Sequence, residues 1–213
     1  MTTQQVEIYQ GQFGEFTITQ SDRTEVIIYR AGLAVAALSL AIGSIFLLSL
    51  GATPTVLQLL TPLFGVFSLS LAISLVTIHI YLALLQRLLQ LFWLIGTTSA
   101  IVLLLTNSQP LALVIYNQPL TILGIGFTFA ALTGIYFKEA FCFNRLETKL
   151  LTFLVPGLLL GHITSILPTE TEKILLALWT ILFMIFVGRK TVQPLPPDIG
   201  DKSVFVYLKE QNN

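Results

Sequence analysis

The sequence predicts an all-α membrane protein with six transmembrane helices and short β elements at both termini, on the same side of the membrane. Three observations predict this class: the composition, the lengths of the apolar stretches and the placement of the basic residues. Of the 213 residues, 54% are hydrophobic and 10% are charged, whereas soluble domains carry about 25% charged residues. So few polar residues cannot cover the surface of a soluble core.

The charged residues and the cysteine content exclude several classes. Lysine plus arginine and aspartate plus glutamate each number 11, so there is no basic excess for phosphates and no nucleic-acid partner is expected. The single cysteine, Cys142, excludes an internal disulfide. The leader before the first apolar stretch contains Glu7, Glu15 and Asp22. A cleavable signal would have a short basic leader, so we interpret this stretch as a retained span.

The apolar stretches define the spans. A helix needs about 20 mostly apolar residues to cross roughly 30 Å of hydrocarbon. The sixth stretch is short, and we expect Lys173 to reach the headgroups while Thr171 and Glu172 occupy the interface. The predicted spans are residues 31–50, 56–80, 88–105, 119–137, 150–167 and 171–187.

The segment from Leu111 to Tyr116 is apolar but too short to cross. It lies between Pro110 and Pro119. It is either a dip into the membrane interface or an N-terminal extension of the fourth span. We favour the dip, because Asn117 and Pro119 interrupt a continuous helix.

The basic residues orient the six spans. With six spans, Lys173 alone falls on one side. The positive-inside rule then places both termini on the cytoplasmic or stromal side. One span more or fewer would scatter these charges over both faces. The basic residues of the opposite side are Arg23, Arg30, Arg87, Lys138, Arg145, Lys149, Arg189, Lys190, Lys202 and Lys209.

The predicted organisation has an extramembrane segment (1–29), a six-helix domain (30–190) and an extramembrane tail (191–213). Residues 6–19 alternate apolar and polar side chains around two glycines, which predicts short strands or a hairpin. Ser21 and Asp22, followed by Glu25, resemble a helix N-cap, so the first helix should begin there.

The tail contains a proline-rich linker followed by an apolar segment. Residues 194–197 read PLPP, which predicts a stiff connection. Residues 203–208 have the β-branched and aromatic content of a strand. We expect this strand to pair with the N-terminal one, because isolated strands are marginal in water.

Small residues recur at four-residue spacing in three spans. Inside lipid, helices associate through close backbone approach at such residues. The faces contact either another helix of the same bundle, which is the commoner use, or a second copy of the chain. Pro156 should also kink the fifth span. The faces are Gly157 with Gly161, Gly126 with Ala130 and Gly134, and Gly32 with Ala36.

His162 is the one ionisable residue that the sequence places well inside the hydrocarbon. Intramembrane ionisable groups are candidate functional sites, here for a proton relay, a ligand or a cofactor. The commoner alternative is structural. A neutral histidine can bond to nearby hydroxyls, and Thr164 and Ser165 are close in sequence.

Residues 138–149, KEAFCFNRLETK, form a short charged and aromatic segment at the exit of the fourth span. Glu139, Cys142, Glu147 and His79 could converge there as ligands of a transition metal. Their spacing matches no established metal signature. In the commoner alternative the segment is a solvated helix exit, in which Lys138 reaches the headgroups and Glu139 pairs with Arg145 or Arg87.

No catalytic motif is visible in the sequence. It contains no glycine-rich phosphate loop and no HExxH, GxSxG or CxxC pattern. We therefore predict no catalytic residues, and the sequence names no cofactor.

The segment GIYFKEAFCFNRLE, residues 134–147, together with GHI at 161–163 and the six-span layout, resembles an uncharacterised integral membrane family of cyanobacteria and plastids, a domain of unknown function. The resemblance extends from about Tyr29 to the sixth span. It implies a photosynthetic membrane system, either thylakoid or plasma membrane, and it transfers no catalytic or binding residue.

The leading functional hypothesis is a non-enzymatic accessory, assembly or scaffold protein that contacts the bilayer and other membrane proteins or pigments. It depends on the few polar residues in the spans, the small-residue faces and the structured ends. The alternative is a small channel or carrier that uses His162 and the kinked fifth span. A metal-dependent enzyme is the third hypothesis.

Overall fold

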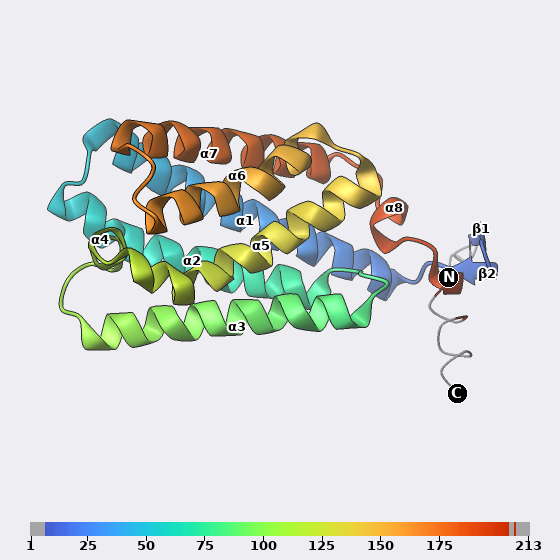
Figure 1. The fold of residues 1–213 in the computed structure, drawn as a ribbon. Coiled ribbons are helices and arrows are strands. Elements are labelled where there is room, and N and C mark those ends of the chain that lie inside the picture. Colours follow the sequence, from blue (N-terminus) through green and yellow to red (C-terminus); the bar gives the residue numbers. More distant parts are fainter. Residues whose placement is uncertain (1–6, 205–206, 208–213) are drawn as a thin grey trace.

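The computed structural model describes residues 7–204 and 207, and in this part of the chain six helices are long and apolar enough to cross a membrane. They pack side by side as one bundle (Figure 1). Their number confirms the predicted spans. They are α1 (Gln20–Leu50), α2 (Pro54–Thr77), α3 (Ala83–Thr106), α5 (Ile122–Phe143) with the preceding 3-10 turn η1 (Pro119–Thr121), α6 (Leu146–Ile163) and α7 (Thr169–Thr191).

Helix α1 begins slightly earlier than the sequence indicates. Its N-cap is Thr19, whose hydroxyl accepts a hydrogen bond from the Asp22 amide at 3.3 Å. The Asp22 carboxylate accepts one from the Thr19 amide at 2.7 Å. This reciprocal capping box satisfies two amides that the helix leaves free. Asp22 is therefore the third residue of the helix rather than its cap, and the predicted cap at Ser21 and Asp22 is wrong.

The segment Leu111–Asn117 forms a separate short helix, α4. The Leu111 amide donates a hydrogen bond to the Thr61 hydroxyl of α2 at 3.3 Å. After α4 the chain turns through η1, which begins at Pro119, before α5 starts. Proline has no amide hydrogen and cannot continue a helix from its preceding turn. The segment is thus not an N-terminal extension of α5.

A two-stranded antiparallel sheet precedes α1. It consists of β1 (Ile8–Gly11) and β2 (Gly14–Thr17), with Ile8 opposite Thr17 and Gly11 opposite Gly14. The predicted N-terminal hairpin is confirmed. The predicted C-terminal strand is wrong where the chain is described: residues 202–204 and 207 are helical. Residues 205, 206 and 208 of that prediction lie outside the described residues.

The tail nevertheless contacts the hairpin, by side-chain hydrogen bonds. Asp201 accepts a hydrogen bond from the Gln12 amide at 2.6 Å, and the Ser203 hydroxyl accepts one from the Phe13 amide at 3.1 Å. The rings of Phe13 and Tyr207 stack with centroids 4.0 Å apart. Gln12 and Phe13 form the hairpin turn, so their amides are not used by the strand ladder. The tail supplies acceptors for them, and a third strand is not needed.

Acid should detach the tail from the hairpin. Hydrogen bonds from the Ser203 hydroxyl and the Gln12 amide lower the pKa of Asp201. Because the pKa of Asp201 is lower when the tail is docked, the ionised carboxylate stabilises the docked state. This stabilisation is complete above the ordinary aspartate pKa of about 3.9, and it is lost as the pH falls through the pKa that Asp201 has in the docked state. Hydrogen exchange should therefore show protection of the Gln12 and Phe13 amides at pH 6 that decreases near pH 3.

The variant Asp201→Asn is the matched control for this titration. It keeps the shape of the side chain but cannot carry the charge, so protection of the two turn amides should be weak at both pH values. Protection in this variant equal to that of the wild type at pH 6 would show that Asp201 does not hold the tail.

The basic residues gather at one end of the bundle. This basic end carries the hairpin, the α2–α3 loop, the α5–α6 turn and the end of α7 (Figure 1). Lys173 lies in the first turns of α7, at the opposite end. The one-sided distribution is thus confirmed for the described part of the chain. The basic end holds Arg23, Arg30, Arg87, Lys138, Arg145, Lys149, Arg189, Lys190 and Lys202.

The small residues serve packing within the bundle at two of the predicted faces. A side chain at Gly32 of α1 would approach Ser74 of α2, and one at Gly134 of α5 would approach Leu89 of α3. A side chain at Gly161 would meet Leu167, which follows in the α6–α7 loop. Nothing lies within 4 Å of the same point at Gly157. The Gly157–Gly161 pair therefore does not pack against a neighbouring span of this chain.

Aromatic side chains fill the centre of the bundle. Tyr136 of α5 lies against Phe183 and Phe186 of α7, with ring centroids 5.4 and 5.9 Å away. The indole of Trp179 donates a hydrogen bond to the Tyr136 hydroxyl at 3.2 Å. This layer separates the polar groups at the two ends of the bundle.

Candidate functional site at the basic end of the bundle

Four buried charged side chains from four elements meet at the basic end. Arg30 comes from α1, Glu139 from the last turns of α5, and Lys190 from the last turn of α7. Asp198 comes from α8 (Pro196–Ile199), a short helix after α7 that lies against the end of the bundle (Figure 1). We call these four residues, together with Lys138, the ionic network.

Lys190 is the centre of the ionic network. Its ammonium lies 2.6 Å from the Glu139 carboxylate and also donates to the Asp198 carboxylate. It lies 4.2 Å from the centre of the Phe143 ring, within cation–π range. The side chains of Lys190 and Glu139 are 1% and 0% exposed. A lysine so buried requires such partners, because an unpaired charge inside a protein costs several kcal/mol.

Arg30 attaches the chain after α7 to the first helix. Its guanidinium donates to Asp198 at 2.8 Å from Nε and 2.6 Å from Nη2. It also donates to the carbonyls of Gln193 and Pro194, at 2.6 and 2.9 Å. All three guanidinium nitrogens therefore donate hydrogen bonds to the short segment from Gln193 to Asp198. The planar guanidinium thereby fixes the position as well as the charge of that segment.

Glu139 has two further donors. The Tyr29 hydroxyl donates to it at 3.1 Å and the Lys138 ammonium at 3.0 Å. The ionic network thus holds three basic and two acidic side chains, each with a partner. Removing one partner of a buried pair is far more damaging than the pair is favourable, because the other charge is left unpaired. The arrangement holds α1, α5, α7 and α8 in fixed positions.

A second set of polar groups borders the ionic network at the α5–α6 turn. Arg145 donates to the Gln193 side chain, and Arg189 donates to Glu147 at 2.9 Å. Asn144 ends α5 in the left-handed conformation, with φ of 51°. One nitrogen of Arg145 and one oxygen of Glu147 are buried without a partner among the residues that the structure describes.

The predicted metal ligands do not converge. Glu139 belongs to the ionic network, Glu147 pairs with Arg189, and His79 lies 3.3 Å from Glu25. Cys142 is exposed. Within residues 7–204 and 207 there is no group of three His, Cys, Asp or Glu side chains that could hold a metal. The expected partners of Glu139 are also corrected: they are Lys190 and Lys138, not Arg145 or Arg87.

His162 lies near the end of α6 opposite the basic end, not deep in the bundle. Helix α6 runs from Leu146 to Ile163, several residues earlier than the predicted span, so His162 is next to its last residue. Its Nδ1 lies 2.5 Å from Glu172 of α7, and its ring centroid is 4.9 Å from that of Tyr116 in α4. Its Nε2 is buried and has no hydrogen-bond partner in the described part of the chain. The expected bonds to Thr164 and Ser165 are not present, because the Thr164 hydroxyl donates to backbone carbonyls.

Sequence reasoning did not find Asp198 or the burial of Lys190 and Arg30. One signal was available. Arg30 and Lys190 each border a span on the predicted cytoplasmic side, and the acidic Asp198 follows after a short proline-rich linker. A carboxylate so close to two basic helix ends is a plausible partner for both.

Comparison with known proteins identifies the family. Residues 73–207 match the model of the family described as uncharacterized integral membrane protein (DUF2301). The match begins within α2, later than the resemblance in the sequence indicated, and it includes Glu139, Lys190 and Asp198. No curated protein and no solved structure matches the chain. The chain is thus a multi-pass integral membrane protein, and it belongs to the DUF2301 family.

Proposed function

We propose that the protein is a non-enzymatic accessory protein that contacts other membrane proteins through the extramembrane surface of its basic end. The observation that carries this proposal is the combination of fixed extramembrane elements with exposed apolar side chains on them. Ile8 and Phe13 of the hairpin are 63% and 45% exposed, and Leu82 of the α2–α3 loop is 66% exposed. Exposed apolar side chains on ordered elements outside the spans are typical of contact surfaces.

The tail connects the hairpin turn to the α2–α3 loop. Residues 200–203 contact the hairpin turn on one side and the Tyr81 hydroxyl on the other. Gly200 has φ of 76°, and a side chain there would overlap the Tyr81 hydroxyl. The glycine therefore permits the close approach of the tail to the α2–α3 loop. The ionic network holds Asp198 against the bundle and Ile199 beside it is buried, so the surface keeps a fixed shape.

The orientation and the membrane are part of the proposal. The excess of lysine and arginine at the basic end supports a cytoplasmic or stromal location for both termini. A thylakoid or plasma membrane, and pigments among the partners, remain expectations from the sequence. Single cysteines at positions 87 and 149, in a Cys142→Ser background, should be labelled by an impermeant maleimide from the same side. Labelling from opposite sides would contradict the six-span orientation.

Site-specific cross-linking tests the accessory function. A photo-reactive amino acid at position 13 should give a discrete adduct with one membrane protein in native membranes. The matched control is the same amino acid at position 120, because Leu120 is 71% exposed and belongs to η1, which joins α4 to α5 at the end of the bundle opposite the hairpin. The adduct should be absent there. A protein that purifies alone in mild detergent and gives no adduct at position 13 would contradict the proposal.

A small channel or carrier is the second candidate. It is favoured by the Nε2 of His162, which has no partner among the described residues, is held beside Glu172 and is free to form a hydrogen bond with a polar ligand. The aromatic layer in the bundle centre would have to open for transport. If the carrier function is correct, His162→Ala should abolish a measurable flux in proteoliposomes, while Thr164→Ala should not. An unchanged flux in His162→Ala would exclude a transport role for this residue.

A further inference from the structure

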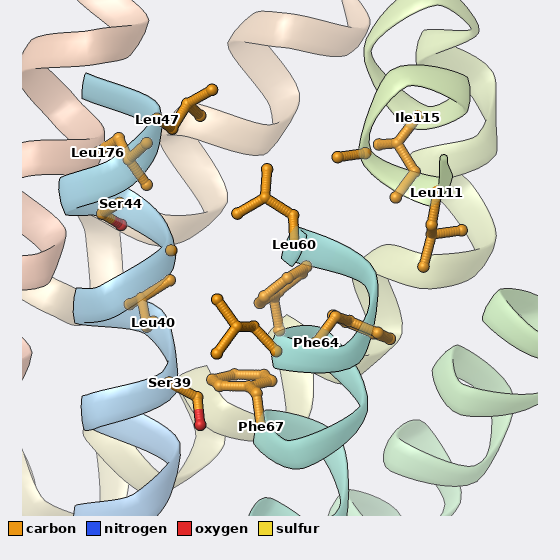
Figure 2. A pocket seen from close by; sticks show the side chains of 14 residues that line it. Ser39, Leu40, Ser44, Leu47, Leu60, Phe64, Phe67, Leu111, Ile115 and Leu176 are labelled. Atoms are coloured by element: carbon orange, nitrogen blue, oxygen red, sulfur yellow. The ribbon is translucent and has the colours of Figure 1, made fainter. Parts of the chain in front are cut away.

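A cavity of about 180 Å³ lies in the half of the bundle away from the ionic network. Its walls come from α1, α2 and α4, with single residues of α5 and α7. Figure 2 shows Leu40 and Leu47 of α1, Leu60 and Phe67 of α2, and Ile115 of α4 around it. Gly43, which also lines the cavity, leaves room at the wall formed by α1.

The lining is almost entirely hydrocarbon. Two hydroxyls interrupt it, and both are engaged: Ser39 donates to the Val35 carbonyl at 2.8 Å, and Ser44 accepts from Thr180 at 2.9 Å. A buried water needs two to four polar partners. The cavity does not provide them, so water is a poor occupant.

The cavity belongs to the part of the protein that the bilayer surrounds. Leu40 and Gly43 lie well inside α1, and Phe64 lies near the middle of α2. Outside these helices the solvent is the acyl chains of the bilayer, and the cavity is not fully enclosed. An apolar cavity of roughly 150 Å³ accepts a benzene-sized guest, so this one has space for a short hydrocarbon segment.

Helix α4 forms the wall at the end of the cavity. Leu111, Ala112 and Ile115 face it, and the helix is held between Pro110 and Pro119. Without α4 this part of α2 would be in direct contact with lipid. Helix α4 thus closes this end of the cavity.

We infer that this cavity binds the end of a hydrocarbon chain of a membrane lipid. The chain enters from the bilayer, lies against Leu40, Leu60 and Phe64, and ends near Phe129. The site selects by shape and apolar contact, with no charged group in its lining. The inference does not depend on the accessory function, because the cavity and the hairpin surface lie at different ends of the bundle.

The fluorescence of Trp179 can report the occupant. Its ring is 5.4 Å from that of Phe129, which lines the cavity, and Trp179 is only 3% exposed. The chain has 2 tryptophans, so Trp93→Phe leaves Trp179 as the single reporter. The probe is phosphatidylcholine with dibrominated acyl chains, since bromine quenches indole fluorescence only at short range.

In bilayers of this lipid Trp179 should be strongly quenched. Adding Ala112→Leu, which fills the cavity, should reduce the quenching at least twofold. The matched control Ala31→Leu makes the same change at an exposed position of α1 and should leave quenching unchanged. No quenching in the Trp93→Phe protein, or equal quenching after Ala112→Leu, would overturn the inference. If Ala112→Leu does not fold, Leu40→Phe fills the cavity from the opposite wall. It should reduce the quenching of Trp179 in the same way, and equal quenching in this variant would overturn the inference.

Discussion

Replacing Lys190 with methionine should lower the free energy of unfolding by about 3–5 kcal/mol, the range measured when one partner of a buried ion pair is removed. Lys190 is the shared partner of Glu139 and Asp198, and all three side chains are at most 1% exposed. Methionine fills similar space but removes the ammonium that joins the two carboxylates, so that, among the described residues, Glu139 keeps only Lys138 and Asp198 keeps only Arg30 as a basic partner. Unfolding of the detergent-solubilised protein by increasing SDS, followed by circular dichroism, would measure the loss.

Lys173→Met is the matched control. Lys173 also pairs with a glutamate, at 2.7 Å, but its side chain is 52% exposed and that of Glu170 is 80% exposed. An exposed ion pair contributes only about 0–1 kcal/mol. Lys190→Met should therefore lower the free energy of unfolding several times more than Lys173→Met does.

A compensated variant tests the cause. Lys190→Met combined with Glu139→Gln removes the buried carboxylate that depends most on Lys190, while Asp198 keeps its ion pair with Arg30, and this double variant should recover part of the lost stability. If the double variant is no more stable than Lys190→Met alone, the loss is due to packing around the side chain and not to the charge left on Glu139. An unchanged free energy in Lys190→Met would show that the ionic network does not hold the helices together.

The helices of this protein follow from its sequence, because hydrocarbon imposes a simple rule on each span. Every backbone group in the bilayer must be bonded within its own helix, so long apolar stretches must be helical. The Lys and Arg pattern then gives the even number of spans. The break at Pro119 also follows from local chemistry, since proline lacks an amide hydrogen. Each of these conclusions depends on one segment at a time.

The ionic network could not be derived in this way. Its members are far apart in the sequence, and the choice of Lys190 over Arg145 or Arg87 as the partner of Glu139 depends on how α7 packs against α5. The C-terminal segment was misassigned for a related reason. Its strand-like composition is overruled by Asp201 and Ser203, which accept hydrogen bonds from the hairpin turn and make a strand ladder unnecessary.

The position of His162 along its helix shows the effect of a small error in the predicted helix boundaries. The sequence indicated residues 150–167 for this span, whereas α6 covers Leu146–Ile163. A shift of four residues is about one helical turn, or roughly 6 Å along the axis. It moves His162 from the interior to the helix end, where Glu172 can reach it.

Replacing Gly96 with alanine should lower the free energy of unfolding by about 1–3 kcal/mol, the usual cost of overpacking. Gly96 of α3 lies against Thr128 of α5. An added methyl group would lie 2.2 Å from the Thr128 hydroxyl oxygen and 2.3 Å from its backbone nitrogen. The hydroxyl could rotate away, but the backbone can move only if α3 and α5 separate. The same SDS titration would measure the effect.

Gly157→Ala separates this contact from the intrinsic effect of glycine. Alanine favours a helix over glycine by up to about 1 kcal/mol, and nothing lies within 4 Å of the added methyl group at Gly157. This variant should be neutral or slightly more stable, so the two alanine substitutions should have opposite signs. Equal effects would mean that α3 does not approach α5 at Gly96. The comparison also assigns the small residues their roles, because Gly96 with Ala100 and Gly157 with Gly161 share the same four-residue spacing, but within the described residues only Gly96 of the two tested glycines has a backbone opposite it. A glycine holds two helices together only where a backbone lies opposite it, and the spacing along one helix does not contain that information.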